Sequence, residues 1–180
     1  MQYSVIFQDK KSGQICDLIL YEGKSADYIR DHSQELLIDC DEDAIIEKTV
    51  CISQLQFSQP DMEALDPAKL YPVIAMDENG EILMYAFANN SAILQTAESG
   101  YACYYSRSRK KQWKKGEDSG HVQEIIKILY QKDKEFFLYR VKQKTAACHT
   151  GYYSCFYRRI SNNAMETVFE KKIFNPKEVY

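Results

Sequence analysis

The chain has 180 residues, of which 45% are hydrophobic and only 7 are glycine and 4 proline, so it is a packed globular protein rather than a low-complexity chain. A formal net charge of −3 argues against a general nucleic-acid binder, and no stretch is apolar for long enough to span a membrane. No secretory signal is visible and the six cysteines contain no C-x-x-C pair, so we expect reduced thiols and a cytoplasmic protein.

The first part of the chain, residues 1–55, is expected to form a small α+β module. Residues 2–8 and 15–21 are β-rich runs separated by a turn sequence, and they predict a hairpin. A helix over 26–37 and a strand over 44–54 are expected to follow. Residues 56–70 contain prolines and only weak periodicity, which predicts a linker.

A second domain is expected over residues 71–160, followed by a C-terminal tail over 161–180. The apolar runs YPVIAMD and EILMYAF are separated by Asn79-Gly80, a pair that favours a type I′ turn. A helix is expected to begin after Asn89 and to end at Gly100. The strand YACYYS then leads into a basic loop, and the runs HVQEIIKILY and FFLYRVKQ predict a second hairpin.

The basic loop, SRSRKKQWKKGEDSGHVQ, has six Lys or Arg residues and no acid between Arg107 and Lys115. On an acidic protein such a loop suits a small phosphorylated ligand, because guanidinium and ammonium groups pair with phosphate oxygens. Trp113 can stack on a base or pack beneath the loop. A solvated run of charge is the alternative, but it would not need the tryptophan or the glycine turns. The substrate-binding candidates are Ser106, Arg107, Ser108, Arg109, Trp113, Lys114, Lys115, Gly116, Glu117, Ser119 and Gly120.

A second cluster, CHTGYYSC, follows the predicted hairpin. Cys148 and Cys155 lie seven residues apart across a glycine-containing loop and could turn back to one metal ion, or they could be two buried thiols. His149 and His121 are candidates for general acid–base catalysis, or are loop histidines bonded to the backbone. Spacing alone does not decide between these alternatives, either for the cysteines or for the histidines.

The segments DENGEILMYAFAN, YYSRSRKKQWKKGEDSGHVQ and CHTGYYSCFY closely resemble, in order and spacing, the signatures of the phosphoribosyl-AMP cyclohydrolases of histidine biosynthesis. The resemblance covers about residues 68–158. It implies an α+β fold with a small mixed β-sheet, an intertwined homodimer with zinc at the subunit interface, and a magnesium site. It also implies hydrolytic opening of a purine ring between N1 and C6 in a phosphorylated nucleotide, with Cys148 and Cys155 on zinc. Zinc with an open position lowers the pKa of bound water to about 7 and so supplies hydroxide.

One feature of the family is altered in this chain. The family hairpin between the last two signatures usually reads D-C-D-x-D; its acids hold magnesium and its cysteine is the third zinc ligand, given across the dimer. Here the aligned residues 131–135 read QKDKE, with Lys132 in place of the cysteine. Lysine cannot replace a thiolate on zinc at neutral pH unless its pKa is strongly lowered. Asp133 and Glu135 remain as weak magnesium candidates.

The D-C-D-x-D pattern does occur elsewhere, at residues 39–43. There Cys40 could complete the zinc site, while Asp39, Asp41 and Asp43 could hold magnesium; the alternative is an acidic turn before a strand. Cys103, His121 or His149 could also serve as the third zinc ligand.

The leading hypothesis is a zinc-dependent cyclohydrolase that acts on a phosphorylated purine nucleotide, as a homodimer without nucleic-acid or membrane partners. Because the phosphate loop is intact while the metal hairpin is altered, the alternative is a catalytically weak or inactive nucleotide-binding or regulatory descendant. A related hydrolase with a different substrate is a third hypothesis.

Overall fold

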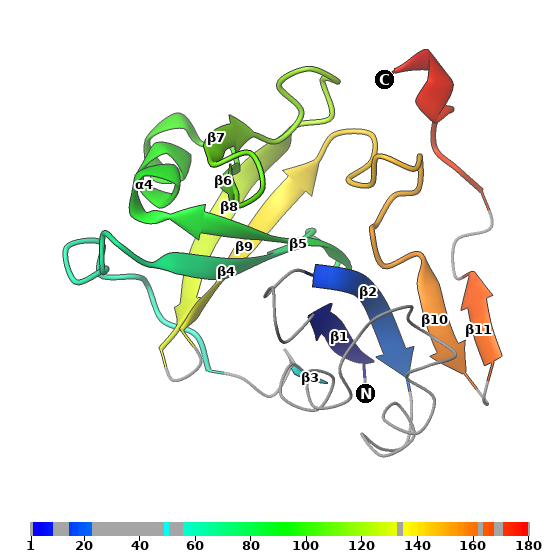
Figure 1. Cartoon of the computed structure of the whole chain (residues 1–180), viewed down its shortest axis with the longest axis horizontal. Helices are drawn as coiled ribbons and strands as arrows, with labels where there is room; N and C mark the ends of the chain where they lie inside the picture. Colours follow the sequence, from blue (N-terminus) through cyan, green and yellow to red (C-terminus); the bar gives the residue numbers. More distant parts are fainter. Residues whose placement is uncertain are drawn as a thin grey trace. The chain divides into compact units, whose positions relative to one another are not determined.

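The computed structural model of the protein describes residues 2–8, 15–22, 49–50, 56–132, 135–161, 164–167 and 171–179, with side chains described for 56–132, 135–157 and 171–179. The chain forms two compact units (Figure 1). One consists of residues 1–55 and 156–170, and the other of residues 56–155 and 171–180.

The first unit is built on a five-stranded sheet with the strand order β11-β10-β2-β1-β3. Its strands are β1 (Gln2–Gln8), β2 (Ile15–Glu22), β3 (Thr49–Val50), β10 (Arg158–Ser161) and β11 (Ala164–Thr167). The antiparallel pairing of β1 with β2 confirms the predicted hairpin, and β10 pairs parallel to β2. The predicted helix over 26–37, the acidic pattern at 39–43 and most of the strand expected over 44–54 lie outside the described residues.

The second unit contains a four-stranded mixed sheet with the order β5-β4-β9-β8. Its strands are β4 (Leu70–Met76), β5 (Ile82–Asn89), β8 (Gln123–Gln131) and β9 (Phe136–Gln143). The two central strands, β4 and β9, are parallel, and each is the partner of an antiparallel hairpin strand. Both predicted hairpins and the mixed sheet of the α+β class are thereby confirmed. A second small sheet pairs β6 (Cys103–Ser106) with β7 (Lys111–Lys114), and the C-terminal part ends in the 3₁₀ turn η2 (Pro176–Glu178).

Helix α4 (Asn90–Ser99) begins and ends where its capping residues stand. The Asn89 side chain accepts a hydrogen bond of 2.9 Å from the backbone N–H of Ala92. Gly100 adopts a left-handed conformation with φ of 72°, and its N–H donates to the carbonyl of Thr96. The predicted helix is confirmed at both ends. Among the described residues, no helix is long and apolar enough to cross a membrane.

The turn between β4 and β5 is not the type I′ turn that the Asn-Gly pair predicts. Only Gly80 has a positive φ (89°), whereas a type I′ turn needs positive φ at both central residues. The Asp77 carboxylate accepts hydrogen bonds from the backbone N–H groups of Asn79 (2.9 Å) and Glu81 (2.8 Å). These bonds stabilise the longer turn, since aspartate at the first position caps the following N–H groups.

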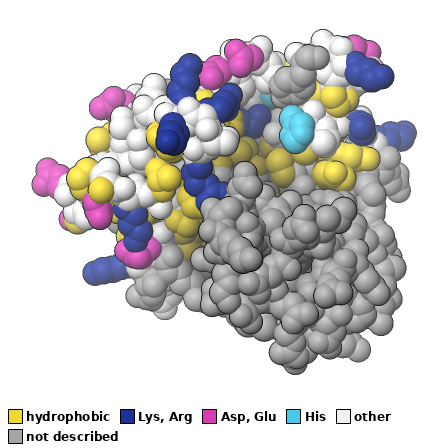
Figure 2. Space-filling view, viewed as in Figure 1, with side chains coloured by type: hydrophobic (Ala, Val, Ile, Leu, Met, Phe, Trp, Pro, Cys, Tyr) yellow, Lys and Arg dark blue, Asp and Glu magenta, His cyan; other side chains and the backbone are white. Residues whose placement is uncertain are grey.

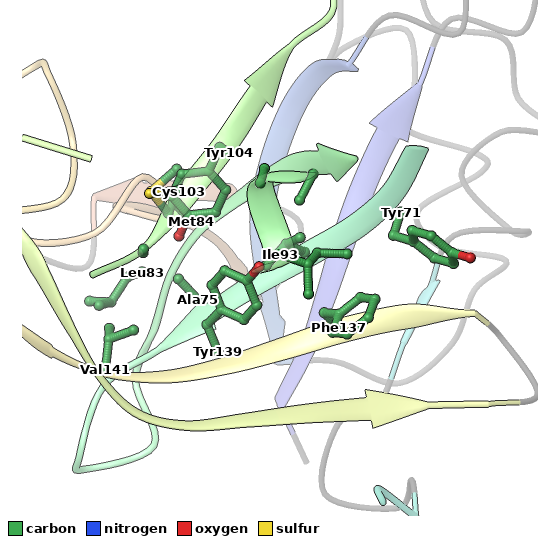
Figure 3. Packing of buried hydrophobic residues seen from close by; sticks show 14 of the residues in the cluster. Tyr71, Ala75, Leu83, Met84, Ile93, Cys103, Tyr104, Phe137, Tyr139 and Val141 are labelled. Carbon is green, nitrogen blue, oxygen red and sulfur yellow. The ribbon is translucent and has the colours of Figure 1, made fainter. Parts of the chain in front are cut away.

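The core of the second unit lies on one face of the four-stranded sheet (Figure 3). Val73 and Ala75 of β4, with Phe137 and Tyr139 of β9, alternate along their strands and are fully buried. Ile93 of α4 and Tyr104 of β6 belong to the same cluster, so the helix and the β6–β7 hairpin pack on this face. This packing fixes the base of the basic loop, which begins where β6 ends.

Candidate active site

The loop of residues 147–155, which carries CHTGYYSC, is tied to strand β5. The Ser154 hydroxyl donates to the carbonyl of Ile82 at 2.5 Å, and the Cys155 N–H donates to the carbonyl of Leu83 at 2.7 Å. The Ala147 N–H donates to the carbonyl of Tyr153 at 2.8 Å and closes the loop. Both cysteines are therefore held against the edge of the sheet.

A further anchor is a residue that the sequence did not single out. Asp77 is only 3% exposed, and its second carboxylate oxygen accepts a hydrogen bond of 2.9 Å from the Tyr153 hydroxyl. Burial, followed by this bond to Asp77, raises the pKa of Tyr153 to about 12, so the phenol keeps its proton. Asp77 thus joins the β4–β5 turn to the cysteine loop. The available signal was its position as the first residue of the segment DENGEILMYAFAN, at the start of a turn.

Cys148 and Cys155 are brought together, as the sequence predicts. Their thiols share a hydrogen bond, which lowers the pKa of Cys148 to about 5. The Thr150 hydroxyl lies 2.8 Å from the Cys148 sulfur and lowers the same pKa, while burial opposes both effects. The bond to Cys148 and burial raise the pKa of Cys155 well above its usual value. The pair therefore holds one thiolate, on Cys148, which accepts a hydrogen bond from the protonated Cys155 thiol.

Lys115 lies with this cysteine pair rather than on the outer surface of the basic loop. It is only 6% exposed, and its ammonium donates a hydrogen bond of 3.2 Å to the backbone carbonyl of His121. Burial lowers the pKa of Lys115, while the Coulombic interactions of its charge with Cys155 and Cys148 oppose this shift. The structure therefore places a positive charge beside the two sulfurs.

The two candidate catalytic histidines differ in their surroundings. His121 is 8% exposed, and its Nδ1 atom has no hydrogen-bond partner among the described residues. Burial, and then the charges of Lys115 and Lys144, lower the pKa of His121, which keeps the imidazole neutral near pH 7. His149 is exposed on the cysteine loop. A neutral buried imidazole with an unused nitrogen is suited to accept or donate a proton.

The basic loop is largely the hairpin β6–β7 and the turn after it. The Arg107 guanidinium lies 4.0 Å from the ring centre of Phe87, and Arg109 donates from its backbone N–H (3.2 Å) and its Nε (3.3 Å) to the Ser106 hydroxyl. Ser108 lies 3.4 Å from the same hydroxyl. Trp113 packs on Tyr104 with ring centres 5.1 Å apart, which favours the alternative that it supports the loop from beneath.

The face in Figure 2 carries Lys and Arg side chains spread among acidic and hydrophobic ones, so its charge is mixed. Lys114 is part of this hairpin, and its ammonium lies 4.0 Å from the ring centre of Tyr101.

The remaining candidates of the loop shape its turns. Glu117 accepts a hydrogen bond of 3.3 Å from the backbone N–H of Lys114, and Ser119 accepts one of 3.4 Å from that of His121. The Gly120 N–H donates to the carbonyl of Gly116 at 2.8 Å. These bonds turn the chain between Lys114 and His121.

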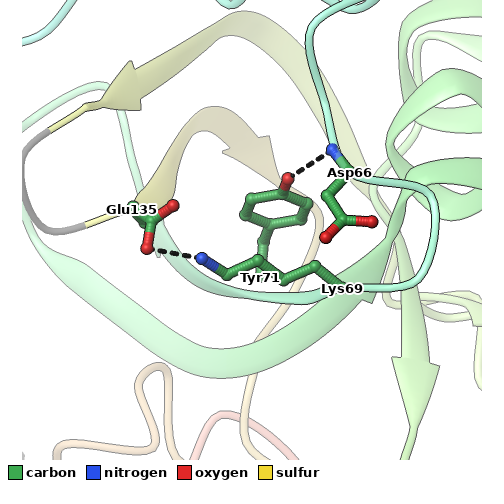
Figure 4. A network of polar contacts seen from close by, with 4 residues as sticks. All are labelled: Asp66, Lys69, Tyr71 and Glu135. Atoms are coloured by element: carbon green, nitrogen blue, oxygen red, sulfur yellow. Dashed lines mark hydrogen bonds and ion pairs between the residues drawn. The ribbon is translucent and has the colours of Figure 1, made fainter.

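The β8–β9 turn contains the altered residues 131–135 and is distinct from the basic loop and the cysteine loop described above. Lys132 is exposed there, and Glu135 forms an ion pair with Lys69 at 2.5 Å (Figure 4). Lys69 also lies over the Tyr71 ring, whose hydroxyl accepts a hydrogen bond from the backbone N–H of Asp66. A cavity of about 630 Å³ borders these residues.

The structure supplies only part of the predicted metal ligands. Cys148 and Cys155 come together, but Asp133 and the candidates Asp39, Cys40, Asp41 and Asp43 lie outside the described residues. Within the part of the chain that is described, no three His, Cys, Asp or Glu side chains gather closely enough to hold a metal ion. Cys103 is only 1% exposed and belongs to the hydrophobic core.

A small mixed sheet with a helix on one face, joined to a loop that pairs two cysteines, defines an α+β protein with a candidate hydrolytic centre. A family model described as phosphoribosyl-AMP cyclohydrolase matches residues 84–157. A protein of that name from Methanospirillum hungatei is 52% identical over 116 residues, which are 64% of this chain and 86% of the relative.

Two further proteins of that name show the same likeness. The one from Methanoregula boonei is 49% identical over 112 residues (62% of this chain, 88% of the relative), and the one from Methanothrix thermoacetophila is 47% identical over 120 residues (66% and 96%). The chain belongs to the phosphoribosyl-AMP cyclohydrolase family. The predicted enzyme class, a hydrolase that acts on a cyclic amidine C–N bond, is confirmed with it.

Proposed function

We propose that this protein opens the adenine ring of phosphoribosyl-AMP by hydrolysis between N1 and C6, a step of histidine biosynthesis. Membership of the family supports the reaction, and one observation carries it to this chain: Cys148 and Cys155 share a hydrogen bond inside an anchored loop. Lys115 and His121 belong to the same neighbourhood, since the Lys115 charge interacts with the thiols and its ammonium donates to the His121 backbone. The His121 Nδ1 atom has no hydrogen-bond partner among the described residues.

The cysteine pair fits zinc as far as the described residues reach. Two adjacent sulfurs, one already a thiolate, are ligands that zinc prefers. Zinc bound there would supply an activated water, which a purine carbon requires at neutral pH. We propose Cys148 and Cys155 as two ligands, with a third from outside the described residues of one chain, for which Cys40 is the candidate. A third ligand from a second copy would require the homodimer that the family resemblance implies.

Magnesium is a weaker part of the proposal. Glu135, one of its candidates, is paired with Lys69, and a cation at that turn would have to compete with two ammonium groups, since Lys132 lies on the same cavity. The acids at 39–43 are the remaining candidates.

The chain's own residues would have distinct roles around the substrate. We propose Arg107 and Arg109 as its phosphate partners, because guanidinium groups pair with phosphate; Arg109 is exposed and Arg107 half-buried on the hairpin that carries Ser106. The neutral His121 imidazole can take or give a proton at a ring nitrogen. Lys115 supplies positive charge beside the thiolates.

A direct assay tests the reaction. Purified protein with one equivalent of zinc is incubated with phosphoribosyl-AMP, and mass spectrometry follows the appearance of a product heavier by one water. We expect turnover that chelation abolishes and zinc restores. The ion pair that Lys69 forms at the altered hairpin favours a second candidate, a nucleotide-binding descendant without catalysis. Saturable binding of the nucleotide with no product, even after zinc is added, would establish that candidate instead.

A further inference from the structure

The C-terminal segment of residues 171–179 returns to the second unit and lies against the cysteine loop. The Ile173 N–H donates a hydrogen bond of 2.7 Å to the carbonyl of Gly151. The Lys172 ammonium lies 5.5 Å from the ring centre of Tyr152, the next residue of the loop. Two adjacent residues of the segment therefore contact two adjacent residues of CHTGYYSC.

The approach of this segment is close enough to require a glycine in the loop. Gly151 has a φ of +94°, and a Cβ atom on it would lie 2.4 Å from the backbone carbonyl oxygen of Phe174. A side chain at position 151 would thus push the segment away.

The next residue of the segment, Phe174, reaches the candidate catalytic histidine. The ring centres of Phe174 and His121 are 4.5 Å apart, with an angle of 60° between the ring planes. His121 Nδ1 is buried and has no hydrogen-bond partner among the described residues, so the imidazole is oriented by packing rather than by a bond to that nitrogen. The aromatic contact with Phe174 is the packing that the structure shows.

We propose that Phe174 is a positioning residue for the active site: it holds the His121 imidazole in its orientation, while residues 172–174 form a wall beside the cysteine loop. The catalytic part of this inference rests on the proposed function. The match to the family model ends at residue 157, so Phe174 lies beyond the segment that the family model describes.

A proton can pass between an imidazole and a substrate only when the ring nitrogen points at the accepting atom, and a loosely held ring spends part of its time in other rotamers. The Phe174 ring, packed against the imidazole, restricts its rotation without competing for its nitrogen. The Nδ1 atom thereby stays buried and without a hydrogen-bond partner among the described residues.

Three variants of the full chain test this role. Phe174→Leu removes the aromatic face, Phe174→Tyr keeps it, and Lys177→Ala is a matched control at an exposed position of the same segment. The ring signals of His121 are followed by NMR with ¹⁵N-labelled histidine, which is practical because the chain has 3 histidines. Steady-state kinetics with phosphoribosyl-AMP follow kcat and KM separately.

We expect Phe174→Leu to shift the His121 ring-proton signals, because the ring current of the neighbouring aromatic ring is lost. We expect kcat to fall about tenfold and KM to change less than about twofold, since only positioning is lost. Phe174→Tyr should restore both readouts, and Lys177→Ala should change neither. Unchanged His121 signals in Phe174→Leu would overturn the contact, and shifted signals with unchanged kcat would overturn the positioning role.

The outcome also separates this inference from the proposed function. A wild-type protein without any turnover contradicts the proposed function alone. In that case the His121 signals decide: one sharp set in the wild type that becomes broadened or doubled in Phe174→Leu supports positioning, and an unaltered sharp set contradicts it.

Discussion

The Lys115 ammonium donates a hydrogen bond of 3.2 Å to the backbone carbonyl of His121, across the turn that joins β7 to β8. The same ammonium faces the thiols of Cys155 and Cys148. A single buried amine therefore connects the tryptophan-containing segment of the basic loop to the cysteine pair. The two signature clusters, which lie far apart in the sequence, meet at this side chain.

Replacing this amine should weaken metal binding. Lys115→Met removes the charge that favours two thiolates, and both sulfurs must lose their protons to bind zinc. We expect zinc affinity, measured by competition with a chelator, to fall about tenfold or more, which corresponds to about 1.4 kcal/mol. Lys142→Met, at an exposed position of β9, serves as the control and should bind zinc like the wild type. Equal affinities of the two variants would show that Lys115 does not support the thiolates.

Two glycines of the same turn offer a matched comparison of stability. Gly116 and Gly120 have similar positive φ values (77° and 72°), so alanine at either position should cost about 1–2 kcal/mol of conformational strain. A Cβ atom on Gly116 would also lie 2.4 Å from the backbone carbon of His121, whereas Gly120 has nothing within 4 Å. Urea unfolding should therefore show Gly116→Ala to be less stable than Gly120→Ala by about 1–3 kcal/mol. Equal losses would mean that the chain relaxes around the new methyl group.

The cysteine pair predicts a pH dependence in the metal-free protein. The hydrogen bond from Cys155 lowers the pKa of Cys148 to about 5, so this sulfur should be a thiolate at pH 7 and gain a proton as the pH falls through about 5. Thiolate absorbance in the ultraviolet should show this transition and lose it in Cys148→Ala. A transition that begins only near pH 8, the range of an ordinary cysteine, would contradict the observed pairing.

The elements of the second unit could be predicted from local patterns, but the details of the site could not. Apolar runs separated by turn residues predicted both hairpins, and Asn89 and Gly100 predicted the ends of α4. The β4–β5 turn was predicted wrongly as type I′, because the side-chain bonds of Asp77 outweigh the preference of the Asn-Gly pair. The turn propensities of residue types do not account for such side-chain bonds. Here the Asp77 carboxylate also accepts a hydrogen bond from Tyr153, which is distant in the sequence.

The burial of Lys115 is a second case that sequence reasoning could not reach. A lysine in a basic run is normally exposed, so a phosphate contact was the natural expectation. The cost of burying the Lys115 charge is offset by thiols more than thirty residues further along the chain and by a backbone carbonyl. Neither partner has a sequence signal. The contact of Phe174 with His121 likewise depends on tertiary structure alone.

The phosphate role of the basic hairpin stays a prediction that binding can test. Arg107→Ala should raise the dissociation constant for phosphoribosyl-AMP about tenfold at low salt, because a guanidinium is a strong partner of phosphate. The difference from the wild type should shrink as salt is added, since exposed charges are screened. Lys127→Ala, at an exposed position on β8, is the control. An affinity that is unchanged at low salt would assign the substrate phosphates to other residues.

The most direct measurement is kcat/KM for phosphoribosyl-AMP in a metal-defined buffer, compared between the wild type and Cys148→Ser after zinc is supplied to both. The account predicts measurable turnover in the wild type and a loss of at least about a hundredfold in Cys148→Ser, since the serine cannot act as a zinc-binding thiolate. Cys103→Ala, a core cysteine outside the site, should retain activity. Equal turnover of Cys148→Ser and the wild type, or no turnover in either, would contradict the account.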